Sequence, residues 1–246
     1  MKKYAGYIII PALLSVMIYS GCGKSGNCLT STGKIIQEVR SVGAFDSIDV
    51  RDNVNVILIM DSVNKVVVES GKNIISGITT DVADHQLTIQ NLNKCNWLRS
   101  YDKPLNVYIS VKKLLKINYT STGTITSSNR LNFEKLEIEV WGGSGSIDLD
   151  LALSVGTFIL HQGTADITLR GTCGIASIYT GEFGKFTGKD FKCGYVFIQN
   201  TGSNDSYVWV WQSLEATIKS IGNIYYTGNP PQVITHITGT GRLIPY

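Results

Sequence analysis

The chain has 246 residues, enough for one sizeable core, and a formal net charge of +3 at pH 7. Residues 1–21 carry two lysines and no acid, so the remainder has a net charge of +1, without a block of clustered Lys and Arg. This balance disfavours a nucleic-acid partner, which needs a basic face. Abundant Gly, Thr, Ser, Val, Ile and Tyr, without the Ala-, Leu- and Glu-rich stretches of long helices, predict a β-rich protein.

The first residues are typical of a signal peptide. Lys2 and Lys3 precede an apolar run over 7–18, which is shorter than the roughly 20 residues of a membrane-spanning helix. The run ends in Tyr19-Ser20-Gly21-Cys22, which resembles a lipobox with Tyr where Leu or Val is more usual. We therefore expect residues 1–21 to be removed, Cys22 to be acylated and 22–41 to form a flexible tether. The alternative is an ordinary secretory signal with an incidental cysteine.

Residues 42–118 form a predicted N-terminal β region. Short segments alternate apolar and polar residues, with turn residues at Asp52-Asn53, Ser70-Gly71 and Asp84-His85 between them. The expected strands run from Phe45 to Val50 and over 54–59, 65–69, 86–90 and 105–109.

Residues 119–246 contain the clearest repeats. A glycine followed by a small or polar residue and an alternating segment returns at positions 123, 145, 163, 181, 202, 222 and 239, at intervals of 22, 18, 18, 21, 20 and 17 residues. A mean near 20 residues predicts one coil of a parallel, right-handed β-solenoid, in which each coil buries its apolar side chains against its neighbours. The fold class is thus all-β with 42–246 as one domain, and an antiparallel sandwich is the alternative.

Aligning the units gives a detailed register. With Gly145 over Gly163, the side chains expected to point inward are Ile147, Leu149 and Leu151 over Ala165, Ile167 and Leu169. The segment from Cys173 to Ile178 matches that from Cys193 to Ile198 at a separation of 20 residues. The unit between Gly181 and Gly188 fits poorly, because Lys185 would point inward unless the register shifts.

Several segments together resemble a known bacterial family. They are Lys72-Asn73-Ile74-Ile75, 79–82, 86–91, 94–101 and the closing 222–230, combined with the glycine units. Over about residues 42–244 the chain is similar to the putative auto-transporter adhesin head GIN domain family of Bacteroidetes-type bacteria. The resemblance implies an exported β-helical lipoprotein of unestablished biochemical role, and it brings no catalytic residue.

The chain has no recognisable catalytic or cofactor-binding motif. His85, His161 and His236 lack acidic or cysteine neighbours at metal-ligand spacing, so we expect them to be surface or satisfied residues. A serine elbow, a phosphate loop and a dinucleotide fingerprint are also missing from the sequence. We therefore expect no catalytic residues, no cofactor, no metal and no enzymatic activity.

One column of acids is a candidate for calcium binding or acid–base chemistry. The register stacks Asp148 on Asp166, about 4.8 Å apart, and places Asp205 two coils further on. Calcium takes roughly six to eight oxygen ligands, which this column with Asp150 does not supply, so a solvated column is preferred and calcium is the alternative. A polysaccharide lyase would also need a base, for which only Arg170 is near.

The cysteines fall into two candidate pairs. Cys173 and Cys193 occupy equivalent positions in successive units, within reach of a disulfide, with stacked buried thiols as the alternative. Cys28 and Cys95 would be the other pair, by elimination only.

An outward row of aromatic residues is the most informative local feature. Val208 and Val210 are assigned inward, so Tyr207, Trp209 and Trp211 point outward, and Trp141 could extend the patch. Exposed aromatic faces suit glycans and protein partners. The row is ordinary core instead if the N-terminal strands or the 228–238 loop cover it.

These patterns predict an outer-membrane lipoprotein, on the periplasmic face or at the cell surface, whose β-solenoid is a non-catalytic binding or adhesion scaffold. The expected partners are the membrane, through the lipid on Cys22, and a glycan or envelope protein. Residues 23–27 contain no acid, unlike the segment after the cysteine in surface-exported lipoproteins of this bacterial group, which favours the periplasmic face. The alternatives are a polysaccharide lyase-like enzyme on the same scaffold and a purely structural envelope protein.

Overall fold

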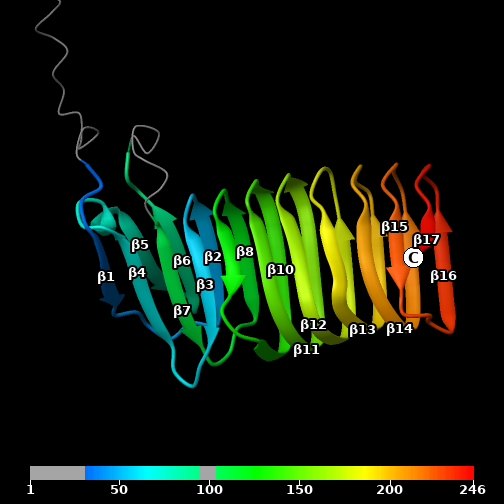
Figure 1. Ribbon diagram of the computed structural model, residues 1–246, viewed down its shortest axis with the longest axis horizontal. Helices are drawn as coiled ribbons and strands as arrows, with labels where there is room; N and C mark the ends of the chain where they lie inside the picture. Colours follow the sequence, from blue (N-terminus) through cyan, green and yellow to red (C-terminus); the bar gives the residue numbers. More distant parts are fainter. Residues whose placement is uncertain (1–30, 95–103) are drawn as a thin grey trace, which may run out of the picture.

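The protein is a β-solenoid. A computed structural model describes residues 31–94 and 104–246, and 68% of these residues are in strands. Parallel coils about 20 residues apart stack in about six turns along one long axis (Figure 1). The predicted solenoid is therefore confirmed, and the antiparallel sandwich is excluded for the repeats. Within the described residues the helical structure is limited to one 3-10 turn, Ile75–Gly77.

Seventeen strands follow one another in the described chain. They are β1 Ile35–Arg40, β2 Ser47–Asp52, β3 Asn55–Met60, β4 Lys65–Gly71, β5 Ile78–Ala83, β6 Gln86–Asn91, β7 Asn106–Val111, β8 Lys116–Ser121, β9 Thr124–Ser127, β10 Leu131–Gly143, β11 Ser146–Gly163, β12 Asp166–Thr180, β13 Phe186–Asn200, β14 Ser206–Ile218, β15 Ile224–Thr227, β16 Gln232–Ile237 and β17 Leu243–Pro245.

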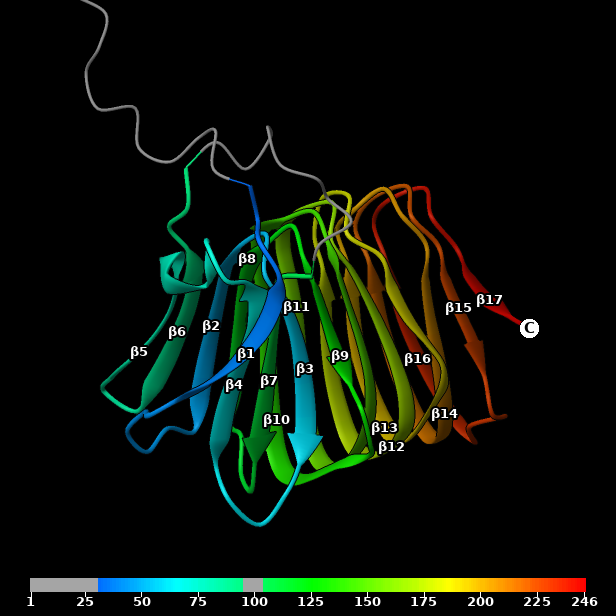
Figure 2. The same cartoon turned by 60° about the vertical axis from the view of Figure 1, so that its left-hand side comes forward.

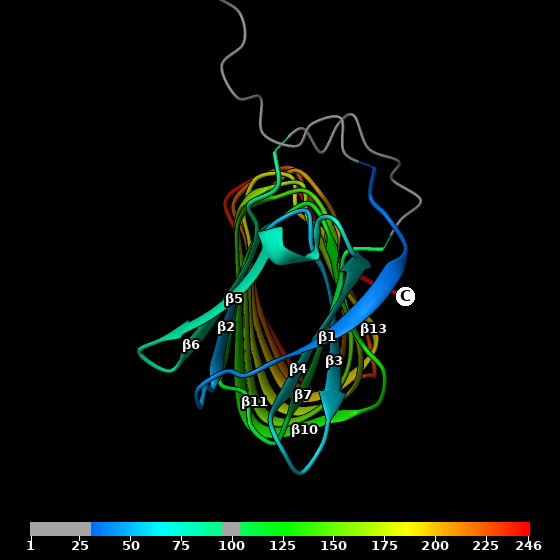
Figure 3. The same cartoon turned by 90° about the vertical axis from the view of Figure 1, so that its left-hand side faces the viewer.

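The strands build two walls that close a flattened tube (Figure 3). Wall 1 has the order β1-β4-β7-β3-β9, continues through the first halves of β11 to β14 and ends in β15 and β17. Wall 2 has the order β5-β6-β2-β8, continues through the second halves of β10 to β14 and ends in β16. The strands β10 to β14 are 13 to 18 residues long because each bends from one wall into the other.

The interior is filled by the side chains that the alternation assigned inward. Ile147, Leu149 and Leu151 are at most 1% exposed, as are the three inward side chains expected on the next coil. Burying an aliphatic side chain of this size contributes about 1.5–3 kcal/mol relative to leaving it exposed. A single coil has no second layer of its own, so this contribution depends on the stacking of neighbouring coils.

The pairing of β11 with β12 differs by two residues from the predicted register. Asp166 pairs with Ser146 instead of Asp148, because Gly163 stacks on Gly143 at the corner. A shift of two residues leaves every side chain on its predicted face, since the strand period is two. The prediction of which side chains point inward is therefore confirmed, whereas the predicted pairing of outward side chains on β11 and β12 is wrong.

The later coils follow the predicted separation more closely. Cys173 pairs with Cys193 and Ile178 with Ile198, which confirms the 20-residue match. The register shift that Lys185 required is also present, because Ile167 of β12 pairs with Phe186 of β13 and not with Lys185. Phe186 takes the inward position and Lys185 faces outward.

The N-terminal end is closed by antiparallel strands (Figures 2 and 3). The predicted strands of the N-terminal β region are confirmed, and β2 and β8 pair in parallel as part of wall 2. The turn at Asp84-His85 has positive φ at both residues and joins the β5–β6 hairpin, which extends beyond the outline of the coils in Figure 3.

The predicted tether over 22–41 is wrong in its second half. Residues Ile35–Arg40 form β1, which pairs antiparallel with β4 and crosses the end of the tube (Figure 3). The sequence pattern of this strand gives little warning of it, because apolar and polar residues do not alternate along Ile35–Arg40 although their exposure does. Cys22 and the expected signal peptide lie outside the described residues.

Glycine is required where successive corners touch. Gly163 has φ +100°, and a Cβ added there would lie 2.5 Å from the carbonyl oxygen of Gly143 on the preceding coil. Gly142, at the same corner, has φ +75°, but an added Cβ there would meet no atom within 4 Å. Comparing substitutions at Gly142 and Gly163 therefore separates the cost of the left-handed backbone from the cost of overlap between coils.

Replacing Gly163 by Ala should lower the free energy of unfolding more than Gly142→Ala does. The left-handed backbone costs each variant about 1–2 kcal/mol, and overlap with the neighbouring coil adds roughly 1–3 kcal/mol for Gly163→Ala only. Urea unfolding followed by circular dichroism measures the difference. Equal losses in the two variants would contradict a close approach of the corners.

Candidate binding surface

The aromatic row predicted on β14 faces outward. Val208 and Val210 are buried, whereas Tyr207 and Trp209 are partly exposed and Trp211 is 48% exposed. The N-terminal strands lie at the opposite end of the solenoid (Figure 1), and β16 of the 228–238 segment pairs in wall 2. Neither segment covers the row, so these rings are not core.

The rings belong to a larger group, which we call the C-terminal aromatic cluster: Tyr207, Trp209, Trp211, Tyr225 and Tyr246. The ring of Tyr207 stacks on that of Tyr225 with centroids 4.9 Å apart and planes at 11°. Tyr246 meets both edge-on, at 6.0 Å from Tyr207. Trp209 and Trp211 form an edge contact with centroids 6.1 Å apart. The cluster therefore spans β14, β15 and the residue after β17, on the outside of wall 1 and the adjoining bend.

Lysines from the preceding coil lie over these rings. The Nζ atom of Lys189 is 4.2 Å from the centroid of Tyr207, and that of Lys185 is 5.4 Å from it. Lys192 lies 5.6 Å from Trp209. Ammonium groups at these distances interact favourably with aromatic faces. Sequence reasoning missed all three lysines, although they precede the aromatic row by about one repeat.

Trp141 does not extend the cluster, contrary to expectation. The second half of β10 belongs to wall 2, so its outward side chains lie on the other side of the tube. There Trp141 stacks on His161 with centroids 3.6 Å apart and donates a hydrogen bond to Glu139 at 3.1 Å. The sequence gives the alternation along β10 but not the bend that carries its end into another wall.

Wall 2 carries a shallow groove of its own. Its hollow of about 380 Å³ crosses β11 to β14 and is lined by small polar residues beside Ile159, Tyr179 and Phe197. Ile175 and Tyr195, paired on neighbouring coils, are also exposed on this wall. The sequence analysis did not single out these residues, and the register of β11 to β14 brings them together.

The predicted stack of Asp148 on Asp166 does not form, because of the two-residue register difference. Asp148 instead pairs with Arg170 at 2.5 Å, and Asp150 pairs with Arg130 at 2.8 Å. Within residues 31–94 and 104–246 no three His, Cys, Asp or Glu side chains come together as metal ligands. The calcium alternative has no site in this part of the chain, and the arginine beside the acids is an ion-pair partner.

Millimolar Ca²⁺ should therefore leave the melting temperature unchanged within error, as measured by differential scanning fluorimetry. Chelation with EDTA should have no effect either, because the aspartates of this column are held by arginines and backbone N–H groups. A rise in melting temperature with Ca²⁺ that Asp148→Asn abolishes would contradict this description.

Cys173 and Cys193 are buried free thiols on neighbouring coils. The hydrogen bond with Cys173, together with burial, raises the pKa of the Cys193 thiol. The structure thus has the stacked thiols that the sequence left as one of two outcomes. The other candidate pair, Cys28 and Cys95, lies outside the described residues.

These thiols should react slowly with Ellman's reagent in the native protein and rapidly in urea, since reaction requires an exposed thiolate. The measurement needs Cys22, Cys28 and Cys95 replaced by Ser, so that only this pair contributes. Release of two equivalents of product within seconds from the native protein would contradict the burial.

A known family covers most of the β-solenoid domain. The family model described as "Putative auto-transporter adhesin, head GIN domain" matches residues 44–230, most of the chain. The chain belongs to this family. The resemblance first seen in the sequence is thereby confirmed, and no curated protein matches the chain.

Solved structures share the fold of this head GIN domain protein. A putative adhesin from Bacteroides fragilis is 21% identical, with 87% of this chain and 97% of that chain covered and a TM-score of 0.79. A putative lipid binding protein from Parabacteroides distasonis is 19% identical, with 88% and 98% covered and a TM-score of 0.68. A putative adhesin from Parabacteroides merdae is 17% identical, with the same coverage and a TM-score of 0.65.

The family and the structural neighbours are described as adhesins or binding proteins rather than enzymes. An adhesin-like family is typical of the cell envelope. In the part of the chain that the structure describes, no helix has the length and hydropathy of a membrane span.

Proposed function

We propose that this protein is an envelope-tethered, non-catalytic scaffold whose C-terminal aromatic cluster binds glycans. The observation that carries the proposal is the exposed set of rings on the last coils. Aromatic rings offer apolar contact with a polar edge, which suits sugars, and a large exposed aromatic group on a folded domain usually marks an interaction site.

The position of the cluster fits a tethered binder. The described chain enters at β1, and β14 lies eight strands further along wall 1, about 38 Å away at 4.8 Å per strand. Acylation at Cys22 would hold the β1 end at the outer membrane and leave the cluster at the far end. In this proposal the periplasmic face is favoured, and the cell surface is the alternative.

The lyase-like enzyme is the weaker alternative. Catalysis of that kind needs an acid and a base that converge in a groove. The central carboxylates, Asp148 and Asp150, each form an ion pair with an arginine on the outer surface. The groove of wall 2 contains one carboxylate, Glu215, and no histidine or lysine among its lining residues.

A second candidate function uses the groove of wall 2. One structural neighbour is described as a putative lipid binding protein. The groove here combines Phe197, 47% exposed, with Ile159 and Tyr179, which suits an apolar ligand. Variants on the two walls therefore distinguish the two functions.

Replacing Trp209 and Trp211 together by Ala should abolish binding of the purified protein to a glycan array while the circular dichroism spectrum stays unchanged. The matched control is Phe197→Ala, an equally exposed ring on wall 2, which should keep glycan binding. Unfolding of the double variant would place both rings in the core, and loss of glycan binding in Phe197→Ala alone would move the site to wall 2.

Cys22→Ser should shift the protein from the membrane fraction to the soluble envelope fraction, because the expected acyl chain is lost. Protease treatment of intact cells then tests which face of the membrane carries the domain. Retention of Cys22→Ser in the membrane fraction would count against the lipid anchor.

A further inference from the structure

We infer that the C-terminal aromatic cluster selects acidic glycans, those that carry carboxylate or sulfate groups, through Lys185, Lys189 and Lys192. This inference rests on the proposed function and adds the chemical class of the ligand. It is carried by the contacts between these lysines and the rings, which the sequence did not reveal.

The three lysines form a cationic edge without carboxylate neutralisation. Among the described residues, none of them has an acidic partner within ion-pairing distance. Some basic residues in the earlier coils do form ion pairs. Lys116 contacts two glutamates, and Arg130 and Arg170 each pair with an aspartate. A cation left without a carboxylate is available to an anionic ligand.

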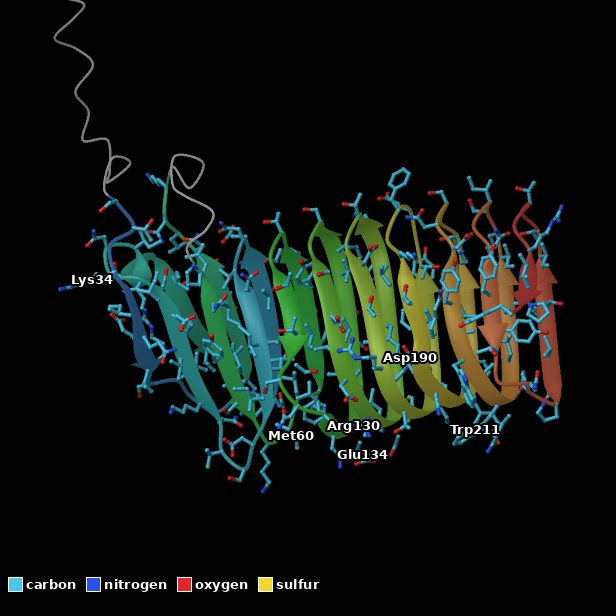
Figure 4. All side chains as sticks on the ribbon, in the orientation of Figure 1. Lys34, Met60, Arg130, Glu134, Asp190 and Trp211 are labelled. Carbon is cyan, nitrogen blue, oxygen red and sulfur yellow. The ribbon has the colours of Figure 1, made fainter. Side chains whose placement is uncertain are left out.

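Asp190 follows Lys189 in the chain, and it is exposed on β13 (Figure 4). Burial and the negative charge of Asp190 raise the pKa of Tyr246, so this tyrosine stays protonated and can donate a hydrogen bond. The three ammonium groups outnumber this carboxylate, so the lysines and Asp190 together carry a net positive charge. The excess suits a polymer with spaced negative charges.

The geometry at Tyr207 disfavours the stacking of a nucleic-acid base. Tyr207 has Tyr225 stacked on it, while the ammonium of Lys189 also lies over its ring, so this ring offers its edge and hydroxyl to a ligand. Bases bind single-strand sites by stacking on open aromatic planes. Trp211, exposed at the bend (Figure 4), offers apolar surface on which a sugar ring can pack.

The cluster is also extended along the axis of the solenoid. Its rings come from β14, β15 and the residue after β17, and Lys189 and Lys192 come from β13, the neighbour of β14 in wall 1. Neighbouring strands are about 4.8 Å apart, so the cations and rings form a strip rather than a pocket. A strip matches a linear polymer better than a small molecule.

The test compares the protein with a triple variant, Lys185→Gln, Lys189→Gln and Lys192→Gln. The immobilised probes are polygalacturonate, chondroitin sulfate, dextran and single-stranded DNA. The triple variant should bind the two acidic glycans roughly tenfold more weakly or worse, as three surface charge contacts are lost. The wild-type affinity for these glycans should also decrease with salt.

A charge-matched control carries Lys65→Gln, Lys72→Gln and Lys135→Gln, which are exposed and belong to other coils. It should bind like the wild type, whereas a loss equal to that of the test variant would reduce the effect to net charge and overturn the inference. Polygalacturonate and chondroitin sulfate distinguish a carboxylate from a sulfate preference, and binding to either one supports the inference.

The remaining outcomes separate this inference from the proposed function. Binding to dextran as tight as to the acidic glycans, and unchanged in the test variant, would overturn the acidic selectivity and leave a glycan scaffold. Failure to bind any of the glycans, here and on the array, would overturn both. Tighter binding to DNA than to the glycans would overturn the acidic-glycan ligand.

Discussion

Every other feature of this protein depends on the stacking of inward side chains between neighbouring coils. A coil of about 20 residues has no interior of its own, so its Ile, Leu and Phe side chains leave water only when the next coil is in place. Parallel pairing with a period of two fixes which residues face the interior. The same pairing arranges the outward side chains in columns, and the binding surface proposed for this protein lies on such columns.

The corners decide how those columns line up. Gly143 and Gly163 approach each other closely enough to exclude a Cβ, and this contact sets the register of β11 on β12. The resulting shift of two residues leaves the same side chains buried in the interior, because side chains alternate between the two faces of a strand with a period of two. On the outside it replaces the expected pair of aspartates by two aspartate–arginine ion pairs, so the stacked carboxylates on which the calcium alternative depended do not meet.

The last coils have a different surface. The irregular pairing around Gly188 turns lysines of β13 toward the rings of β14, and the chain end adds Tyr246 to the same group. Aromatic rings and cations thus gather at one end of the solenoid, opposite the end where the chain enters. This asymmetry is the physical basis for a tethered binder that engages its ligand away from the membrane.

The sequence by itself determined the strand alternation, the 20-residue repeat and the inward or outward side of residues such as Ile147 and Trp211, because these follow from the local period of a strand. Long-range geometry decided the rest. The bend in β10 moved Trp141 to the other wall, the corner contact separated Asp148 from Asp166, and the coil-to-coil pairing put Lys189 over Tyr207. Such neighbours lie about one coil apart in the chain, and only the stacking of complete coils specifies which of them meet.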